Sequence, residues 1–434
     1  MDKMADVLGR AGAWCGQNKY LSAIKNAFQN FMPLTIAGAI GVLWCNVLVN
    51  ESTGLGIFFK PIMALEFLNP AFQAVNFCTI SCITVGITLG IAQEIGVWNM
   101  GAEKAGYIPG LVGLAAWLSV TNTWHMVEGA KEAFTGIAGN ELGATGLFTG
   151  MIIGVLSVEL FCFFEKQDAL KIKMPEQVPP GVARAFEVLV PATITLIITA
   201  CIGSACYNLT GLYLNDVIKN GIQGPLGAVG ATIPGVMIIY LVIMLFWLVG
   251  IHGNNMLSAV KEALFTPLAL ENVEKFNKGE KPTNIINMYF LQMCGEFGGS
   301  GVTIGLVIAI MIFGKREDNK AIASLSLVPG LFNINETVTF GIPMVLNPIL
   351  GIPFVVAPLV TIIIGYVLTV IGFCPVACLT VPWTTPPIVF GFLACGANVM
   401  GAVTQAILIV VSTVIYVPFL ISYEKYQNKQ AAEA

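Results

Sequence analysis

The chain has 434 residues, of which 56% are hydrophobic and 11% are charged, and its formal net charge at pH 7 is -4. Soluble globular proteins carry about 25% charged residues, so the composition excludes a compact protein with a fully water-exposed surface and predicts a protein that lies in a membrane. Lysine and arginine form no basic block along the chain, and nucleic acid is therefore not an expected partner.

Long apolar stretches recur along the whole chain. The first residues lack the short apolar core and the small-residue cleavage site of a signal peptide, so we predict an amphipathic, cytoplasmic lead-in. A helix needs about 20 mostly apolar residues to cross the hydrocarbon core of a bilayer, and the stretches predict about ten crossings. They lie near residues 31–50, 72–95, 107–121, 143–164, 188–206, 232–251, 301–314, 321–346, 349–373 and 399–421.

Two further apolar segments are interrupted. Residues 284–300, NIINMYFLQMCGEFGGS, contain a glutamate and end with a glycine pair and a serine, and residues 374–398 contain four prolines. Proline and glycine interrupt the helical hydrogen-bond ladder, and the freed backbone groups are tolerated at membrane depth only where protein or a water-filled cavity receives them. We therefore predict that both segments are re-entrant hairpins that line a cavity.

Basic residues indicate the orientation, because cytoplasmic loops of membrane proteins are enriched in lysine and arginine. We predict that the basic segments and both termini face the cytoplasm, which agrees with an even number of crossings. The basic segments are 165–187, 252–283, 314–320 and the tail after Tyr423.

The two halves of the sequence differ in character. Residues 1–230 hold most of the uninterrupted apolar spans, whereas residues 231–434 hold both broken segments and nearly all of the polar candidates. We predict a scaffold domain over 1–230 and a transport domain over 231–434, each with about five spans.

Polar residues inside the apolar segments are the candidates for function. A carboxylate at the bilayer centre costs about 2.5–3.5 kcal/mol on insertion scales, so Glu336, within LFNINETVTFGIPM, is expected to face a substrate path rather than only to cap a broken helix. Asn333 and Asn335 supply the donors and acceptors that a neutral polyol needs. His252, within WLVGIHGNNML, is flanked by glycines that allow close approach, and Asn254 follows it.

Two more residues have competing interpretations. Trp383, within VPWTTPP, is either a membrane-interface anchor or a flat face for a sugar ring. Glu296, within CGEFGGSG, is a second intramembrane carboxylate beside Ser300. It is either satisfied locally where small residues pack helices closely, or it accepts a hydrogen bond from a sugar hydroxyl.

Several chemistries have no signal in the sequence. The 11 cysteines lie mostly in apolar runs, without the spacing or nearby histidines of a zinc site. The chain has no phosphate-binding loop, no dinucleotide fingerprint and no cysteine in a short glycine/serine loop that could carry a phosphoryl group. We predict no metal and no cofactor, and any phosphoryl donor must be another protein.

An ordered set of motifs resembles the membrane component, enzyme IIC, of bacterial sugar phosphotransferase systems. The resemblance is to the lactose/cellobiose/diacetylchitobiose branch and extends over essentially the whole chain. The motifs are KNAFQNFMPLTIAGA (25–39), GIHG (250–253), GGSGVTIGL (298–306), INE (334–336) followed by FGIPMVLNP (340–348), and PWTTP (382–386).

The resemblance implies an all-α polytopic fold with ten transmembrane helices and two re-entrant hairpins, in the bacterial cell (inner) membrane. It also implies an N-terminal half that forms a homodimer and elevator-type transport of one disaccharide, such as cellobiose or diacetylchitobiose. The sugar is phosphorylated on its 6-hydroxyl by the phosphocysteine of enzyme IIB, which we expect to be a separate protein because the chain ends at residue 434.

The resemblance places His252 and Glu336 at the sugar, and Asn140 near it. Phosphoryl transfer depends mainly on positioning and charge handling, so we expect Glu336 to orient the hydroxyl and take its proton, and His252 to hold the same end of the sugar. Trp383, Asn335, Glu296, Asn254 and Ser300 are the further predicted sugar contacts.

Three positions depart from the family pattern and leave the identity of the sugar open. Thr337 replaces the proline that often follows INE, GNN follows His252 in place of small apolar residues, and Glu296 stands where an apolar residue is expected. The alternatives are a proton-coupled secondary transporter, with Glu336 and His252 as its proton relay, and a channel.

Overall fold

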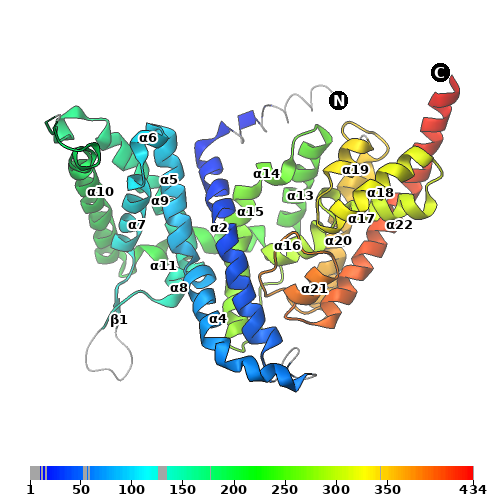
Figure 1. Ribbon diagram of the computed structural model, residues 1–434, viewed down its shortest axis with the longest axis horizontal. Helices are drawn as coiled ribbons and strands as arrows, with labels where there is room; N and C mark the ends of the chain where they lie inside the picture. The colour runs from blue at the N-terminus through cyan, green and yellow to red at the C-terminus, as the bar shows by residue number, and fades with distance from the viewer. Residues whose placement is uncertain are drawn as a thin grey trace. The chain divides into compact units, whose positions relative to one another are not determined.

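A computed structural model describes residues 10, 13–14, 17–51, 56, 59–125, 134–175, 177–342 and 344–433 (Figure 1). Helices make up nearly all of the regular structure in this part of the chain. The strands found there are β1 (Trp124–His125) and β2 (Phe134–Thr135), which form one short antiparallel pair. The predicted all-α fold is therefore confirmed.

The chain divides into two compact units. Gln17–Gly38 and Val75–Gly227 form what we term the amino-terminal unit, and Ala39–Ala74 and Ala228–Ala434, with the first residues, form the cavity unit. The predicted boundary at residue 230 lies close to the junction between Gly227 and Ala228, but Ala39–Ala74 groups with the C-terminal residues. The scaffold and transport roles of the two halves stay predictions.

In the amino-terminal unit, α5 packs against α7 and α9. Close packing is possible because small residues face the neighbouring helix: a Cβ atom built on Gly150 of α9 would lie 2.2 Å from Oγ1 of Thr88 in α5. The helices of this unit are the first part of α2 (Lys19–Leu43), η3 (Phe77–Ser81), α5 (Ile83–Met100), α6 (Ala102–Ala105), α7 (Ile108–Val120), α8 (Gly139–Leu142), α9 (Ala144–Glu165), η4 (Asp168–Leu170), α10 (Pro180–Thr210), α11 (Leu214–Ile218) and η5 (Lys219–Gln223).

In the cavity unit, large aromatic side chains such as Tyr240, Phe265, Phe290 and Phe354 are fully buried in one core. The helices of this unit are η1 (Trp44–Leu48), η2 (Lys60–Leu68), α13 (Ile233–Leu248), α14 (Gly253–Met256), α15 (Ser258–Asn277), α16 (Met288–Gly295), η6 (Ser300–Val302), α17 (Ile304–Phe313), α18 (Glu317–Leu331), α19 (Glu336–Gly341), α20 (Gly351–Val370), α21 (Val389–Ala394) and α22 (Val399–Glu433). Two more helices, α4 (Asn69–Asn76) and α12 (Gly224–Gly230), contain residues of both units.

The first broken segment bends where its sequence places glycine. Met288–Val302 and Ile304–Phe313 meet at 59°. Gly299 has a φ of +87°, and a Cβ atom there would lie 2.6 Å from the side chain of Asn335. A residue with a side chain would meet both backbone strain and a clash at this point, so glycine is what brings the break close to the INE motif.

Buried amide side chains form hydrogen bonds with backbone groups of the second broken segment, where no helical partner is available. Gln405, which is 1% exposed on α22, accepts hydrogen bonds from the backbone N–H groups of Ile388 and Gly391, each at 2.7 Å, and donates to the carbonyl of Met293 at 3.1 Å. Asn287 donates to the carbonyl of Ala377 at 3.0 Å. These bonds hold the two broken segments together and satisfy groups that lack helical partners.

Within the described residues, five helices are long and apolar enough to cross a membrane, and up to seven if each of two bent pairs is one span. The count of ten crossings stays a prediction. The stretch 321–346, predicted as one crossing, contains two helices, because α18 ends at Leu331 and α19 begins at Glu336. Asn333, between them, has a φ of +63°, which the helical conformation does not allow.

Candidate functional site

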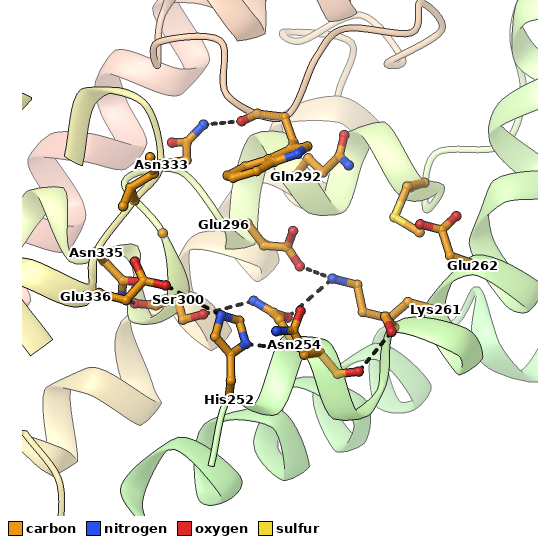
Figure 2. Close-up of a pocket in the computed structure, with 16 residues that line it drawn as sticks. His252, Asn254, Lys261, Glu262, Gln292, Glu296, Ser300, Asn333, Asn335 and Glu336 are labelled. Carbon is orange, nitrogen blue, oxygen red and sulfur yellow. Dashed lines mark hydrogen bonds and ion pairs between the residues drawn. The ribbon is translucent and has the colours of Figure 1, made fainter. Parts of the chain in front are cut away.

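The cavity unit encloses a cavity of about 560 Å³ (Figure 2). This volume falls in the range of about 300–1,000 Å³ that is typical of small-molecule sites. Polar side chains from α14, α15, the break after α16, the turn before α19 and the 374–398 segment meet here. The lining residues are His252, Asn254, Asn255, Ser258, Lys261, Glu262, Met288, Gln292, Glu296, Gly299, Ser300, Asn333, Ile334, Asn335, Glu336 and Trp383.

His252 is held in place by its own helix and by a buried tryptophan. It caps α14, and its Nδ1 accepts a hydrogen bond from the backbone N–H of Asn255 at 3.3 Å. Its ring centroid lies 4.4 Å from that of Trp247, which is 2% exposed. Because Nδ1 is an acceptor, the proton of the neutral ring is on Nε2, which is the nitrogen nearer Glu336.

Glu336 keeps its hydrogen-bonding capacity for another group. Its Oε1 lies 3.8 Å from Nε2 of His252, and the side chains of Glu336 and His252 are 48% and 37% exposed. This distance exceeds that of a direct hydrogen bond. In the part of the chain that the structure describes, Glu336 forms no ion pair with lysine or arginine. The N–H donor at Nε2 of His252 and the carboxylate acceptor of Glu336 therefore face the same part of the cavity (Figure 2).

The two asparagines before Glu336 connect backbone segments. Asn335 is 4% exposed and donates to the carbonyl of Ser300 at 2.8 Å. Asn333 accepts from the backbone N–H of Gly298 at 2.6 Å and donates to the carbonyls of Trp383 and Thr385, the latter at 3.2 Å. The amide groups that the sequence suggested for a polyol thus also join the first broken segment, the INE turn and the second broken segment.

Lys261 is a cavity residue that the sequence did not suggest. We took it as one of the basic residues of the segment 252–283, which is predicted to face the cytoplasm, and the structure places it in α15, 6% exposed and on the cavity wall. Its ammonium pairs with the carboxylate of Glu296 and donates to Oδ1 of Asn254 at 3.3 Å. Tyr240 donates its hydroxyl to the same carboxylate at 2.8 Å, so Glu296 is satisfied within the protein.

The remaining predicted site residues divide between the two units. Asn254 donates to Oγ of Ser300 at 2.9 Å, and Trp383, 44% exposed, lines the cavity with its carbonyl held by Asn333. The structure therefore brings seven of the eight predicted residues to one cavity. Asn140 lies in α8, in the amino-terminal unit, and is not among the lining residues; its role at the sugar stays a prediction.

Besides Lys261, four polar lining residues were not among the predicted site residues: Asn255, Ser258, Glu262 and Gln292. Three of them, with Lys261, lie on α14 and α15, in the stretch that we took for a basic cytoplasmic segment. The sequence does contain a pattern that favours a half-buried helix here, because Lys261 and Glu262 are followed directly by the apolar run ALF within a segment of helical length. That signal alone does not tell a cavity wall from an amphipathic helix on the surface.

Comparisons with known proteins point to one family. The model of the family "Phosphotransferase system, EIIC" matches residues 25–358. The PTS system oligo-beta-mannoside-specific EIIC component of Bacillus subtilis is 33% identical over 429 residues, which cover 98% of this chain and 94% of the relative. The PTS system lactose-specific EIICB component of Streptococcus mutans is 28% identical over 96% of this chain and 71% of the relative.

A solved structure has the same fold over almost its whole length. The transporter ChbC, the IIC component from the N,N'-diacetylchitobiose-specific phosphotransferase system, superposes on this chain with a TM-score of 0.88. The two are 30% identical in sequence, and the superposition covers 97% of each chain.

Proposed function

The chain belongs to the EIIC family of the sugar phosphotransferase system, and from this premise we propose that it carries a β-linked disaccharide inward while phosphorylated EIIB transfers a phosphoryl group to the 6-hydroxyl of the sugar. The observation that carries the proposal is the pair His252 and Glu336, which face one cavity 3.8 Å apart with no lysine or arginine neutralising the acid among the described residues. Family membership also favours this function over proton-coupled transport.

The specificities given in the names of the relatives support the substrate class. One is specific for oligo-β-mannoside, one for lactose and one for N,N'-diacetylchitobiose. All three are saccharides with β linkages, and a disaccharide such as cellobiose or diacetylchitobiose suits a cavity of about 560 Å³. The lactose-specific relative is an EIICB component, which supports an EIIB protein as the partner of this chain.

The proposed transfer is a displacement at phosphorus. The sugar oxygen attacks the phosphoryl group on the EIIB cysteine, the O–P bond forms as the S–P bond breaks, and the cysteine leaves as a thiolate. Glu336 orients the attacking hydroxyl and takes its proton, and His252 donates from Nε2 to the same end of the sugar. Positioning of this kind supplies most of the catalysis in phosphoryl transfer.

Further side chains hold the rest of the sugar. Trp383 presents a ring face for stacking against the C–H face of a sugar. Asn254, Ser300 and Asn335 hold the hydroxyl-binding wall in shape through the bonds that join them. Glu296 acts at the sugar only through its partner Lys261.

The arrangement in the membrane is also proposed. The family and the apolar helices identify a multi-pass membrane protein. We propose the inner membrane of a bacterial cell with both termini in the cytoplasm, a homodimer formed through the N-terminal half, and elevator-type movement of the C-terminal half.

Membrane vesicles test the proposal directly. Vesicles containing the protein are given phosphorylated or unphosphorylated EIIB on the cytoplasmic side and a labelled β-linked disaccharide on the other. Sugar phosphate should form inside only with phosphorylated EIIB. Accumulation of unmodified sugar that follows a proton gradient would overturn the proposal in favour of the proton-coupled alternative.

A further inference from the structure

The charged residues of the cavity do not balance. Three glutamates and one lysine line it, with His252 as the only other titratable side chain among the lining residues. Lys261 is used by Glu296, and Glu336 faces His252. The third acid, Glu262, accepts a hydrogen bond from the hydroxyl of Thr266 and forms no ion pair with any described residue. The cavity lining therefore has more carboxyl groups than cationic side chains that could pair with them.

A buried acceptor without a donor also lines the cavity. Gln292 is on α16, which packs against α15, the helix of Glu262. Its Oε1 is buried and has no hydrogen-bond partner within the described chain. Figure 2 shows Glu262 on the opposite side of the cavity from Glu336, with Lys261 and Glu296 between them, and Gln292 away from Glu336 as well. We call Glu262 and Gln292 the acceptor wall.

A neutral sugar satisfies this wall incompletely. Hydroxyl groups can donate to both residues, but they leave the charge of Glu262 without a counter-charge, and a charge removed from water is costly unless it is paired. An acetamido group brings one N–H donor and also a carbonyl acceptor, which adds no counter-charge. Lys261 is already committed to Glu296 and Asn254, so no described residue forms an ion pair with Glu262.

A protonated amine fits the acceptor wall. An ammonium group has three N–H donors and no acceptor, and its bond to a carboxylate is roughly twice as strong as a bond between neutral groups. We propose that the disaccharide carried by this protein contains an amino sugar with a free amino group, which binds as an ammonium to Glu262 and donates to Oε1 of Gln292. This inference rests on the proposed function, because it places one ring at His252 and Glu336 and the other at the acceptor wall.

Three disaccharides that share ring, linkage and length test the inference. Cellobiose carries a hydroxyl at the second carbon of each ring, N,N'-diacetylchitobiose carries an acetamido group, and fully deacetylated chitobiose carries an amine. Their Kd values are measured on purified full-length protein at about pH 6, where an amine with a pKa of roughly 7.7–8.0 is protonated. The deacetylated sugar should bind about tenfold more tightly than either neutral sugar, given the strength of hydrogen bonds to charged groups.

Variants locate the effect. Glu262→Gln keeps the shape and removes the charge, so the preference for the amine should fall close to unity. Glu274→Gln is the matched control: Glu274 is on the same helix, outside the cavity, and ion-paired with Lys278 at 2.6 Å, so the preference should be unchanged. If Glu262→Gln does not fold, Gln292→Leu is measured instead, with a several-fold loss of amine binding expected.

The outcomes separate the two proposals. If none of the three disaccharides binds, the proposed sugar function fails and the inference with it. If a neutral sugar binds as tightly as the amine or more tightly, the inference fails and the sugar function stands. A tenfold preference that survives Glu262→Gln also overturns the inference, because the ammonium would then be recognised elsewhere.

Discussion

Two regions of the molecule differ in how the chain surrounds a carboxylate. In the amino-terminal unit, Glu165 is 1% exposed and pairs with Lys104 at 2.9 Å and with Arg184 at 3.0 Å. In the cavity unit, Glu336 is 48% exposed and faces a histidine at a distance too long for a hydrogen bond. The first acid is fully satisfied by the chain, whereas the second retains capacity for a ligand.

The same difference is found between two acids of the cavity, Glu296 and Glu336. Glu296 has Lys261 and Tyr240 as partners and resembles Glu165 in being fully satisfied. Removing one member of such a buried pair is strongly destabilising, because it leaves an uncompensated charge. Acids with cations beside them are therefore expected to affect stability when changed, and acids without them to affect function.

The largest expected effect is on catalysis. Glu336→Gln preserves size and removes the proton acceptor, so the rate of sugar phosphorylation by phosphorylated EIIB should fall by about 10²–10⁴-fold, while thermal unfolding stays close to that of the natural protein. Single-turnover transfer to labelled disaccharide measures the rate. Turnover at the ordinary rate would show that Glu336, like Glu165, has a structural role only.

Glu165→Gln is the matched control for that measurement. It removes a carboxylate from the other unit, so it should lower the unfolding temperature and leave phosphorylation per folded molecule unchanged.

A smaller effect, on stability, is expected at the ion pair of the cavity. Lys261→Met should lower the free energy of unfolding by about 3–5 kcal/mol, because it leaves the charge of Glu296 unpaired. The double variant Lys261→Met/Glu296→Leu should recover most of this loss. Denaturant or thermal unfolding of the four proteins in detergent gives the coupling energy, and additive losses would show that the two residues do not act as a pair.

The smallest effect is expected at the tryptophan of the cavity. Trp383→Ala removes an indole that is only half-buried in the protein, so disaccharide binding should weaken by about 1–3 kcal/mol, the value of burying one large side chain. Calorimetric titration measures the change, and Trp98→Ala, at an exposed position on α5, serves as the control. Unchanged binding in Trp383→Ala would identify Trp383 as a membrane-interface anchor.

Short motifs in the sequence suggested candidate site residues, but they did not suggest which side chains contact one another. GIHG and INE are contiguous motifs, so His252 and Glu336 were recognisable as candidates from the sequence. The partner of Glu296 was not recognisable, because Lys261 lies 35 residues away and reads as one more basic residue. The break before Glu336 was also missed, since Asn333 and Asn335 lie in a run that is apolar enough to continue α18.

The amino-acid sequence by itself determined that this protein is helical and lies in a membrane, because both follow from composition and from the lengths of its apolar runs. It also determined where two of those runs break, since glycine and proline act on their own backbone. Tertiary structure alone decided which charges are paired, that residues 39–74 group with the C-terminal residues, and that Gln292 on the cavity wall retains an acceptor without a donor in the described chain. These properties depend on contacts between residues far apart in the chain, and such contacts leave no periodicity or spacing in the sequence.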